Sequence, residues 1–420
     1  MLFSPFFRAK GLLNSRRVKR FILPACLLLG ATMAWAKLSP LAPTPDWSQL
    51  NVFQETITKD DFTRLLSEVY APNGAWKSYI TIYDDSALIT TRPGASPFLL
   101  KFAPSRAAAK PVVTYWRKGK QLPLEPGKPL AGLKIALDPG HIGGSWAKME
   151  ERWFKIGNSK PVTEGDMTLK VAKMLVPRLE ALGAQVYLTR SKAWPVTSQR
   201  PDKLEQAATA SLAEKKTVAT PDAIEGESER LFYRASEIRR RGKLVNENIR
   251  PDIVLCLHFN AEAWGNENDP KLVDENHLHF LIFGALSADE LGYEDQRYDM
   301  LVKLLNRSFS EELSLTNTLS RTMGQETGLP PYFYRQANAI KVNDNPYVWS
   351  RNLLANRLFV CPTVYLEPYV MNSRSVFARI QAGDYDGTRN FGGTQRKSIY
   401  REYADGIVNG LVAYYSNRLP

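Results

Sequence analysis

The chain has 420 residues, of which 44% are hydrophobic and 23% are charged, and these ordinary globular values exclude wholesale disorder. Its length allows two or three domains and a sizeable core. Half of the formal net charge of +12 comes from residues 1–36, which hold six basic residues and no acidic one. The remaining mildly basic chain would be attracted to anionic polymers, but the excess is too small to indicate nucleic-acid binding.

The first 36 residues have the pattern of an export signal peptide. A basic segment ends at Arg20, an apolar run extends from Phe21 to Met33, and Ala34-Trp35-Ala36 supplies small residues for cleavage after Ala36. The apolar run is too short to span a bilayer readily as a permanent helix, although an uncleaved anchor is an open alternative. We therefore expect a periplasmic or secreted protein with no permanent membrane span after signal cleavage.

Two cysteines, Cys256 and Cys361, remain in the mature chain, and both lie in apolar, strand-like segments. Two cysteines do not make a disulfide framework, and buried free cysteines behave as small hydrophobic residues. We expect reduced core residues, with a single bridge as the alternative if the two strands are neighbours.

Residues 37–131 are predicted to form a linker followed by a small α+β accessory module. Prolines and polar residues dominate the start, and apolar spacing predicts a short helix from Thr58 or Lys59 through Tyr70. Strand-like runs separated by turn residues follow at 79–83, 87–91, 98–102 and 112–116. Pro123, Pro126 and Pro129 mark the boundary to the next domain.

From Leu133 onward, predicted strands alternate with helices, which indicates an α/β domain over 132–420. A strand ending before His141, a loop over 142–162, a helix over 163–182 and a strand over 185–190 form a unit typical of a parallel sheet. Further strands are expected at 253–258, 277–283 and 363–367, and further helices at 231–248, 298–313 and 397–415. Enlarged segments near 192–230 and 312–350 are predicted to be insertions, the first irregular and the second containing a long loop.

Three of the predicted strands lead into a chemically capable residue at the same edge of the sheet, namely His141, His258 and Glu367. Glu164 opens the helix that the first loop reaches. Two neutral imidazoles and one carboxylate are a standard set of ligands for catalytic zinc, and a further carboxylate can act as general base and general acid. The four residues together predict a hydrolytic zinc site.

These motifs resemble those of the zinc-dependent N-acetylmuramoyl-L-alanine amidases. The resemblance covers roughly residues 132–417, and its segments come in the order of the family. They are Leu137-Asp138-Pro139-Gly140-His141, the helix from Glu164 to Leu182-Gly183, Val186 to Arg190, Leu257-His258-Phe259-Asn260, and Leu366-Glu367 with Met371-Asn372 beyond. The resemblance implies a mixed, largely parallel α/β sheet flanked by helices, of the zinc exopeptidase/amidase type. It also implies hydrolysis of the amide between the lactyl group of muramic acid and L-alanine in peptidoglycan.

By the same resemblance, His141, Glu164 and His258 would be the zinc ligands and Glu367 the catalytic glutamate. The gap between His141 and Glu164 is longer than the family leads us to expect, so Glu150 and Glu151 are alternatives for the carboxylate ligand.

Two further polar residues lie beside the motifs. Asn260 is expected to bind substrate or orient a ligand, with a turn residue as the alternative. Asp138 is expected either to support a ligand or to close the turn. His277 and His279 share one strand face, but no third ligand accompanies them.

Other functions stay open on the sequence alone. A zinc peptidase of related fold would cleave free peptides that lack muramic acid, and an inactive cell-wall-binding or regulatory homologue would cleave nothing. The expected partner is peptidoglycan. A protein activator, or an autoinhibitory segment within 192–230 or 312–350, is a further alternative.

Overall fold

The structure is a computed structural model that describes residues 37–266, 269–335 and 338–417. The predicted signal peptide lies outside the described residues. Across the described part of the chain, we find no helix with the length and apolar character needed to cross a membrane.

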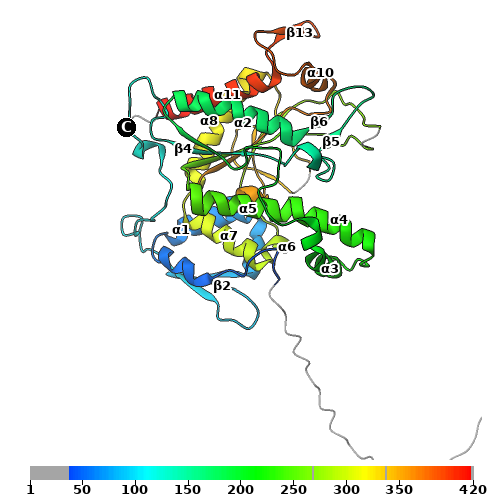
Figure 1. The fold of residues 1–420 in the computed structure, drawn as a ribbon. Coiled ribbons are helices and arrows are strands. Elements are labelled where there is room, and N and C mark those ends of the chain that lie inside the picture. The colour runs from blue at the N-terminus through cyan, green and yellow to red at the C-terminus, as the bar shows by residue number, and fades with distance from the viewer. Residues whose placement is uncertain (1–36, 267–268, 336–337, 418–420) are drawn as a thin grey trace, which may run out of the picture. The chain divides into compact units, whose positions relative to one another are not determined.

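A seven-stranded sheet forms the centre of the α/β region (Figure 1). Its strand order is β10-β11-β9-β12-β8-β4-β7. Four neighbours, β12, β8, β4 and β7, are parallel; β9 runs antiparallel to β12, β11 is parallel to β9, and β10 is antiparallel to β11. The strands are β4 (Lys134–Pro139), β7 (Gln185–Leu188), β8 (Ile253–Leu257), β9 (Leu278–Ile282), β10 (Ile340–Lys341), β11 (Val348–Ser350) and β12 (Thr363–Pro368). The predicted mixed, largely parallel sheet is confirmed.

Side chains alternate between two apolar layers along the central strands. Leu255 and Leu257 of β8 belong to one buried cluster, whereas Val254 and Cys256 belong to another on the opposite face. This alternation follows from the two-residue period of a strand, and both faces are covered because a parallel sheet needs helices on each side.

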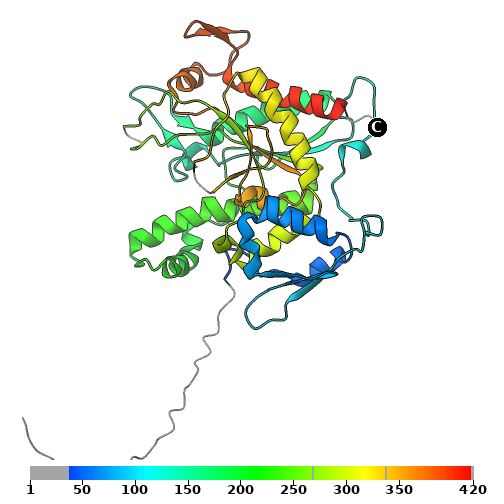
Figure 2. The same ribbon diagram turned by 180° about the vertical axis from the view of Figure 1, so that it is seen from behind.

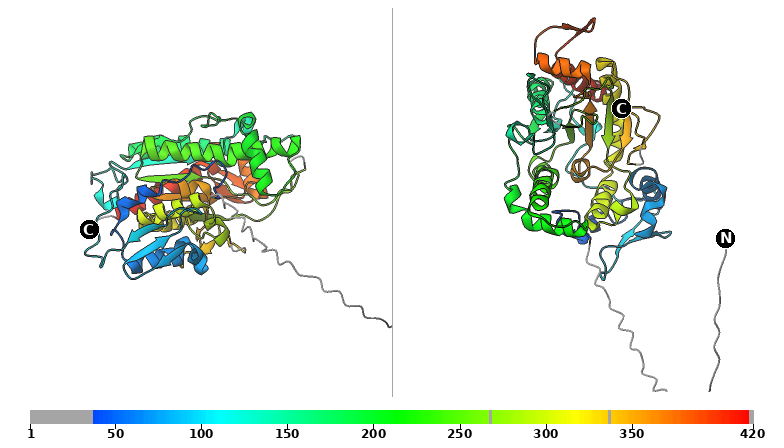
Figure 3. Two further views of the ribbon diagram at one scale, coloured as in Figure 1. Left: turned by 90° about the horizontal axis from the view of Figure 1, so that it is seen from below. Right: turned by 90° about the vertical axis from the view of Figure 1, so that its right-hand side faces the viewer.

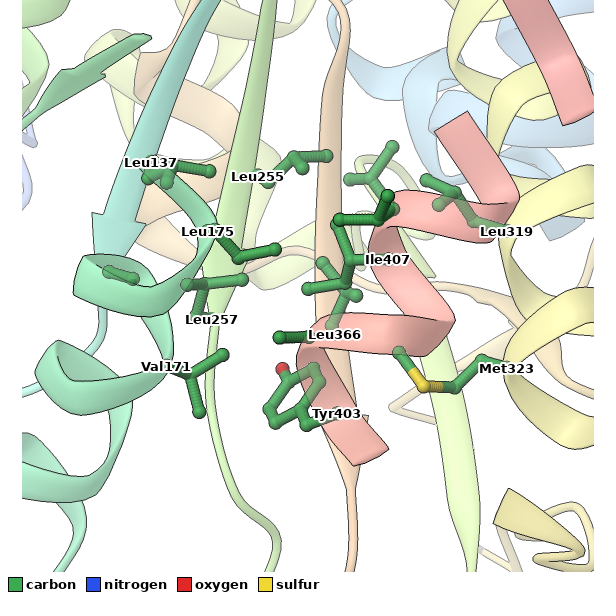
Figure 4. Close-up of a cluster of buried hydrophobic side chains, with 14 of the residues drawn as sticks. Leu137, Val171, Leu175, Leu255, Leu257, Leu319, Met323, Leu366, Tyr403 and Ile407 are labelled. Atoms are coloured by element: carbon green, nitrogen blue, oxygen red, sulfur yellow. The ribbon is translucent and has the colours of Figure 1, made fainter. Parts of the chain in front are cut away.

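Three long helices cover the first face: α2 (Glu164–Ala181), α8 (Phe309–Thr327) and α11 (Ile399–Ser416). Figure 4 shows leucines of the strands meeting Val171 and Leu175 of α2, Leu319 and Met323 of α8, and Ile407 of α11. The predicted helices at 163–182 and 397–415 are thereby confirmed within two residues at each end.

The second face carries α5 (Glu237–Lys243) and α9 (Leu354–Leu358). Cys256 and Cys361 are both buried and free there, as the sequence predicted.

The expectation of an irregular segment over 192–230 is wrong. Two helices, α3 (Glu205–Glu214) and α4 (Pro221–Leu231), pack as a hairpin in its second half. Thr220 caps α4 by accepting from Ala223 N, and Pro221 occupies the first turn, where no backbone donor is missed. The helix continues through two wide turns, η7 (Phe232–Ser236) and η8 (Leu244–Ile249), with α5 between them, and forms one extended run with α4 (Figure 3).

The second enlarged segment is also more helical than expected. The chain forms α7 (Glu294–Leu305) and then α8, so residues 312–327, expected to lie largely in a loop, are helical. Leu315, Leu319 and Met323 form the apolar stripe of α8 and are fully buried. The many serines and threonines between them make this stripe difficult to recognise in the sequence.

The N-terminal region contains α1 (Lys59–Leu65), continued by η2 (Leu66–Tyr70), and an antiparallel sheet of β1 (Ile80–Ile82), β2 (Ser86–Ile89) and β3 (Phe98–Lys101). The strand predicted at 112–116 is wrong, because this segment makes no ladder and instead places Trp116 in the cluster behind the central sheet. Apolar residues of α1 and α7 share one buried cluster. Figure 2 shows the blue ribbon of the N-terminal region against the yellow-green helices that precede α8. Whether residues 37–131 form a domain of their own stays a prediction.

The remaining elements are short or peripheral. They are η1 (Trp47–Phe53), η3 (Pro72–Ser78), η4 (Gly119–Gln121), η5 (Gly144–Trp146), β5 (Trp153–Phe154), β6 (Val162–Thr163), η6 (Pro201–Lys203), α6 (Ala288–Leu291), α10 (Arg374–Ala382), β13 (Arg389–Phe391) and β14 (Thr394–Arg396).

A fully buried ion pair links α7, α8 and the start of β12. Lys303 Nζ donates to Glu312 Oε1 and to the carbonyls of Phe359 and Cys361, at 3.1 and 3.0 Å. Glu312 Oε1 also accepts from Thr363 N at 3.0 Å.

We expect Lys303→Met to lower the free energy of unfolding by about 3–5 kcal/mol, because it leaves the Glu312 charge buried without its partner. The double variant Lys303→Met/Glu312→Gln should lose clearly less free energy of unfolding, because it removes both charges of the pair. The amide oxygen of the glutamine can still accept a hydrogen bond from Thr363 N. Urea unfolding of the three proteins measures both. A single variant within about 1 kcal/mol of the wild type would contradict the assignment.

Candidate functional site

A pocket of about 1000 Å³ opens at the carboxyl edge of β4, β8 and β12. His141, Glu164, His258 and Glu367 all line it. The four residues that the sequence singled out are therefore brought to one cavity.

Two buried arginines hold the turn that carries His141. Arg190 donates to the carbonyls of Pro139 and Gly140 at 3.1 and 3.2 Å. Arg241 donates to the carbonyls of Pro139 and His141 at 2.8 and 2.7 Å. All three carbonyls of the turn are thus paired with a cation, which fixes the position from which the imidazole projects.

The backbone of this turn also requires glycine at its centre. A Cβ on Gly140 would lie 2.2 Å from the His258 ring, so a larger residue would push the two histidines apart. His141 itself adopts a left-handed conformation with φ of 60°, which costs free energy in a residue with a side chain. The two rings then meet edge to face with centroids 5.2 Å apart.

Asp138, just before the turn, supports it from behind. Its carboxylate accepts from the Thr189 hydroxyl and from Arg241 Nη1 at 3.2 Å, and it is almost fully buried. Asp138 thus anchors Arg241, which in turn holds the carbonyls of Pro139 and His141.

Glu150 lies behind His141. Its buried carboxylate accepts from the backbone N–H groups of Ile142 and Gly143 at 2.7 and 2.9 Å and lies 3.3 Å from His141 Nδ1. Burial opposes its ionisation, but His141 and the two N–H groups outweigh burial and lower the pKa of Glu150. A carboxylate on the outer nitrogen of a ligand histidine orients the ring and raises its basicity.

Glu164 faces the inner side of both histidines. Its Oε2 lies 3.2 Å from His141 Nε2, and its Oε1 lies 3.0 Å from His258 Nδ1. Oε1 also accepts from Phe259 N at 3.1 Å. Burial would raise the pKa of Glu164, but the charges of His141, His258 and the adjacent Arg152 dominate and hold that pKa well below its usual range.

A tight glycine contact sets the start of α2, and so the position of Glu164. A Cβ on Gly165 would lie 2.3 Å from Gly143 N, so the loop after His141 packs directly on the first turn of the helix.

Glu151, unlike Glu150 and Glu164, is exposed and pairs with Arg234 at 2.9 Å. Of the three carboxylates considered from the sequence, Glu164 is the one that approaches both histidines.

His258 follows β8 and stacks on Tyr365, with ring centroids 4.3 Å apart and planes tilted by 16°. Burial is the main cause that lowers the pKa of His258, which keeps its imidazole neutral near pH 7. A neutral imidazole is the form that binds metal.

His141, Glu164 and His258 form the group of potential metal ligands found among the described residues, with ligand atoms within 4.8 Å of one another. Glu164 contacts the two rings through different oxygens, with Oε2 3.2 Å from His141 Nε2 and Oε1 3.0 Å from His258 Nδ1. Two imidazoles and one carboxylate are a ligand set that suits catalytic zinc.

Glu367 comes from the end of β12 and is partly buried in the wall of the same pocket. Burial, together with the nearby charge of Glu164, raises the pKa of Glu367 well above the usual value, while Arg152 and Arg351 oppose the shift. A carboxylate with a raised pKa binds a proton more readily, which suits general acid and base work.

Asn260 lines the pocket beyond His258. Its Oδ1 accepts from Ala261 N at 2.7 Å, as in a turn, and its Nδ2 lies 3.3 Å from His277 Nδ1. The second nitrogen of His277 lies 3.1 Å from Glu262, and no third metal ligand joins His277 and His279 among the described residues.

The sequence did not identify the roles of three arginines in this pocket, Arg152, Arg241 and Arg351. Arg241 had a detectable signal, since Glu237 precedes it by four residues on a predicted helix and the two pair at 2.8 Å. Arg152 and Arg351 reach the pocket through tertiary folding alone and carry no local pattern.

No model of a known protein family matches the chain, and no curated protein matches it either. Among solved structures, an N-acetylmuramoyl-L-alanine amidase from Clostridium difficile 630 is 16% identical, with a TM-score of 0.37 over 68% of this chain and 97% of that one. The catalytic domain of the amidase CwlV from Bacillus (Paenibacillus) polymyxa var. colistinus is 15% identical, with a TM-score of 0.37 over 68% and 98%. The amidase Ami1 from Mycobacterium smegmatis is 15% identical, with a TM-score of 0.36 over 68% and 98%.

Proposed function

We propose that the chain is a zinc-dependent hydrolase of the amide between the N-acetylmuramoyl lactyl group and L-alanine in peptidoglycan. The observation that carries the proposal is the meeting of His141, Glu164 and His258 with Glu367 in one pocket. The order of the four motifs along the chain, which resembles that of the amidases, supports the same substrate class. An enzyme with this substrate works outside the cytoplasm, in agreement with the export signal expected at residues 1–36.

In this proposal His141, His258 and Glu164 would hold zinc, which when bound would supply a Lewis acid for the amide carbonyl and would lower the pKa of water to about 7. Glu150 keeps the His141 ring in place, and Tyr365 does the same for His258 by stacking. Glu367 accepts the proton of the attacking water and delivers it to the departing alanine nitrogen. The C–N bond breaks as the C–O bond forms, which leaves a free lactyl carboxylate and a peptide with a free amine.

The ligand set predicts a graded loss of zinc in four variants. Glu164→Ala and His258→Ala each remove a ligand and should abolish stoichiometric zinc at micromolar free metal. Glu150→Gln should bind zinc roughly 10- to 100-fold more weakly, because it removes the carboxylate beside His141 Nδ1 but no zinc ligand. Glu151→Gln is the matched control and should bind like the wild type. Metal analysis after equilibrium dialysis measures all four, and full zinc in Glu164→Ala would contradict the assignment.

The role of Glu367 predicts that Glu367→Gln keeps its zinc but loses activity by on the order of 10²–10⁴ in kcat. The assay digests purified peptidoglycan with the mature protein and identifies the products by mass spectrometry. Wild type and Glu151→Gln should release stem peptides with a free L-alanine amine. The amidase proposal fails if the zinc-loaded wild type releases none, and equal rates in wild type and Glu367→Gln would remove Glu367 from the reaction.

A further inference from the structure

Among the described residues, the pocket contains an arginine that forms no close ion pair with a carboxylate. Three pocket arginines have acidic partners, since Arg152 pairs with Glu164, Arg234 with Glu151, and Arg241 with Glu237. Arg351 lines the same pocket, and among the described residues no carboxylate oxygen lies within 4.0 Å of its guanidinium. It is partly exposed, so the charge is available to a ligand.

The side chain of Arg351 is nevertheless held in place. It follows β11, where its backbone N donates to Ile282 O at 3.0 Å. Its Nη1 donates to the Tyr334 hydroxyl at 3.4 Å, and its guanidinium lies 5.7 Å from the centre of the Tyr334 ring. One nitrogen of the fork is therefore occupied, while a planar guanidinium offers further N–H groups for a second acceptor.

A buried histidine orients Tyr334 in turn. The hydroxyl lies 3.0 Å from His279 Nε2. Burial, with the charges of His277 and Arg351, lowers the pKa of His279 well below its usual value. The Tyr334 hydroxyl is thus shared by His279 Nε2 and Arg351 Nη1, which makes the three residues one connected support.

This support lies next to Glu367. His279 is the cross-strand partner of Glu367 in the β9–β12 ladder, so the two side chains lie on the same face of the sheet. In the proposed reaction Glu367 delivers a proton to the departing nitrogen. The departing nitrogen must then come within reach of Glu367, so a group beside Glu367 would lie within reach of the leaving peptide.

We propose that Arg351, supported by Tyr334, is a subsite for a carboxylate of the leaving peptide, within about two residues of the scissile amide. The subsite rests on the proposed function, because the leaving side is defined by the role of Glu367. A guanidinium fork matches a carboxylate and gives a charge-assisted hydrogen bond that a neutral carboxamide does not replace. The enzyme should accordingly prefer stem peptides with free carboxyl groups over amidated ones.

The test compares N-acetylmuramoyl-L-alanyl-D-glutamate with its diamide, in which both glutamate carboxyls are carboxamides. The zinc-loaded wild type should cleave the carboxylate substrate with a kcat/KM on the order of 10- to 100-fold higher. Arg351→Met should bring the ratio of the two kcat/KM values to about one, because any effect of the lost charge on the pKa of Glu367 acts on both substrates alike. Arg321→Met, which alters an exposed arginine of α8 outside the pocket lining, is the matched control and should behave like the wild type.

Two outcomes overturn the subsite. An equal loss on both substrates would mean that Arg351 acts on the reacting groups or on folding, and no loss on either would mean that substrate does not reach it. Binding of the product dipeptide L-alanyl-D-glutamate, measured by calorimetry without turnover, separates this proposal from the amidase proposal. If the wild type cleaves neither substrate, the amidase proposal fails. The subsite then stands only if the dipeptide binds more tightly than its diamide and Arg351→Met removes the difference.

Discussion

The pairing of the turn carbonyls at residues 139–141 with two buried arginines is the interaction on which the site depends. Arg190 and Arg241 fix a backbone in which Gly140 lies against the His258 ring and His141 takes a left-handed conformation. Buried carbonyls and buried cations each cost free energy when unpaired, and here they satisfy one another. The hydrogen bonds from Arg190 and Arg241 thus keep His141 in its left-handed conformation and orient its imidazole in the absence of a ligand.

The same turn determines where the carboxylates lie. The loop after His141 places Glu150 beside Nδ1 of the His141 ring. The contact between Gly143 of this loop and Gly165 of α2 fixes the start of α2, which places Glu164 beside Nε2 of the same ring. Glu367 approaches from the far side on β12. Three carboxyl groups and two imidazoles thus lie around one small volume, which a divalent cation would stabilise. The charges of Arg152 and Arg351 in the pocket wall oppose the rise in the pKa of Glu367.

The sequence predicted the parts of the site that depend on local pattern. His141, His258 and Glu367 each follow a recognisable apolar strand, and parallel strands bring their carboxyl ends to one edge. The role of Glu150 could not be predicted, because it depends on the path of a loop with no periodic pattern. Arg351 follows β11, whose position beside β9 is a matter of long-range topology. The helix α3 was missed because its small residues give little apolar periodicity, and α4 was missed because most of its residues are polar.

The account's central claim is that His141, Glu164 and His258 together bind one zinc ion. Anomalous diffraction at the zinc edge, from crystals of the mature chain grown with equimolar zinc, tests this most directly. The account predicts one strong peak bonded to the two imidazoles and to the Glu164 carboxylate, with Glu150 on His141 and Glu367 unbonded to the metal. A peak at His277 and His279, or a zinc ion bonded to Glu150 in place of Glu164, would contradict it.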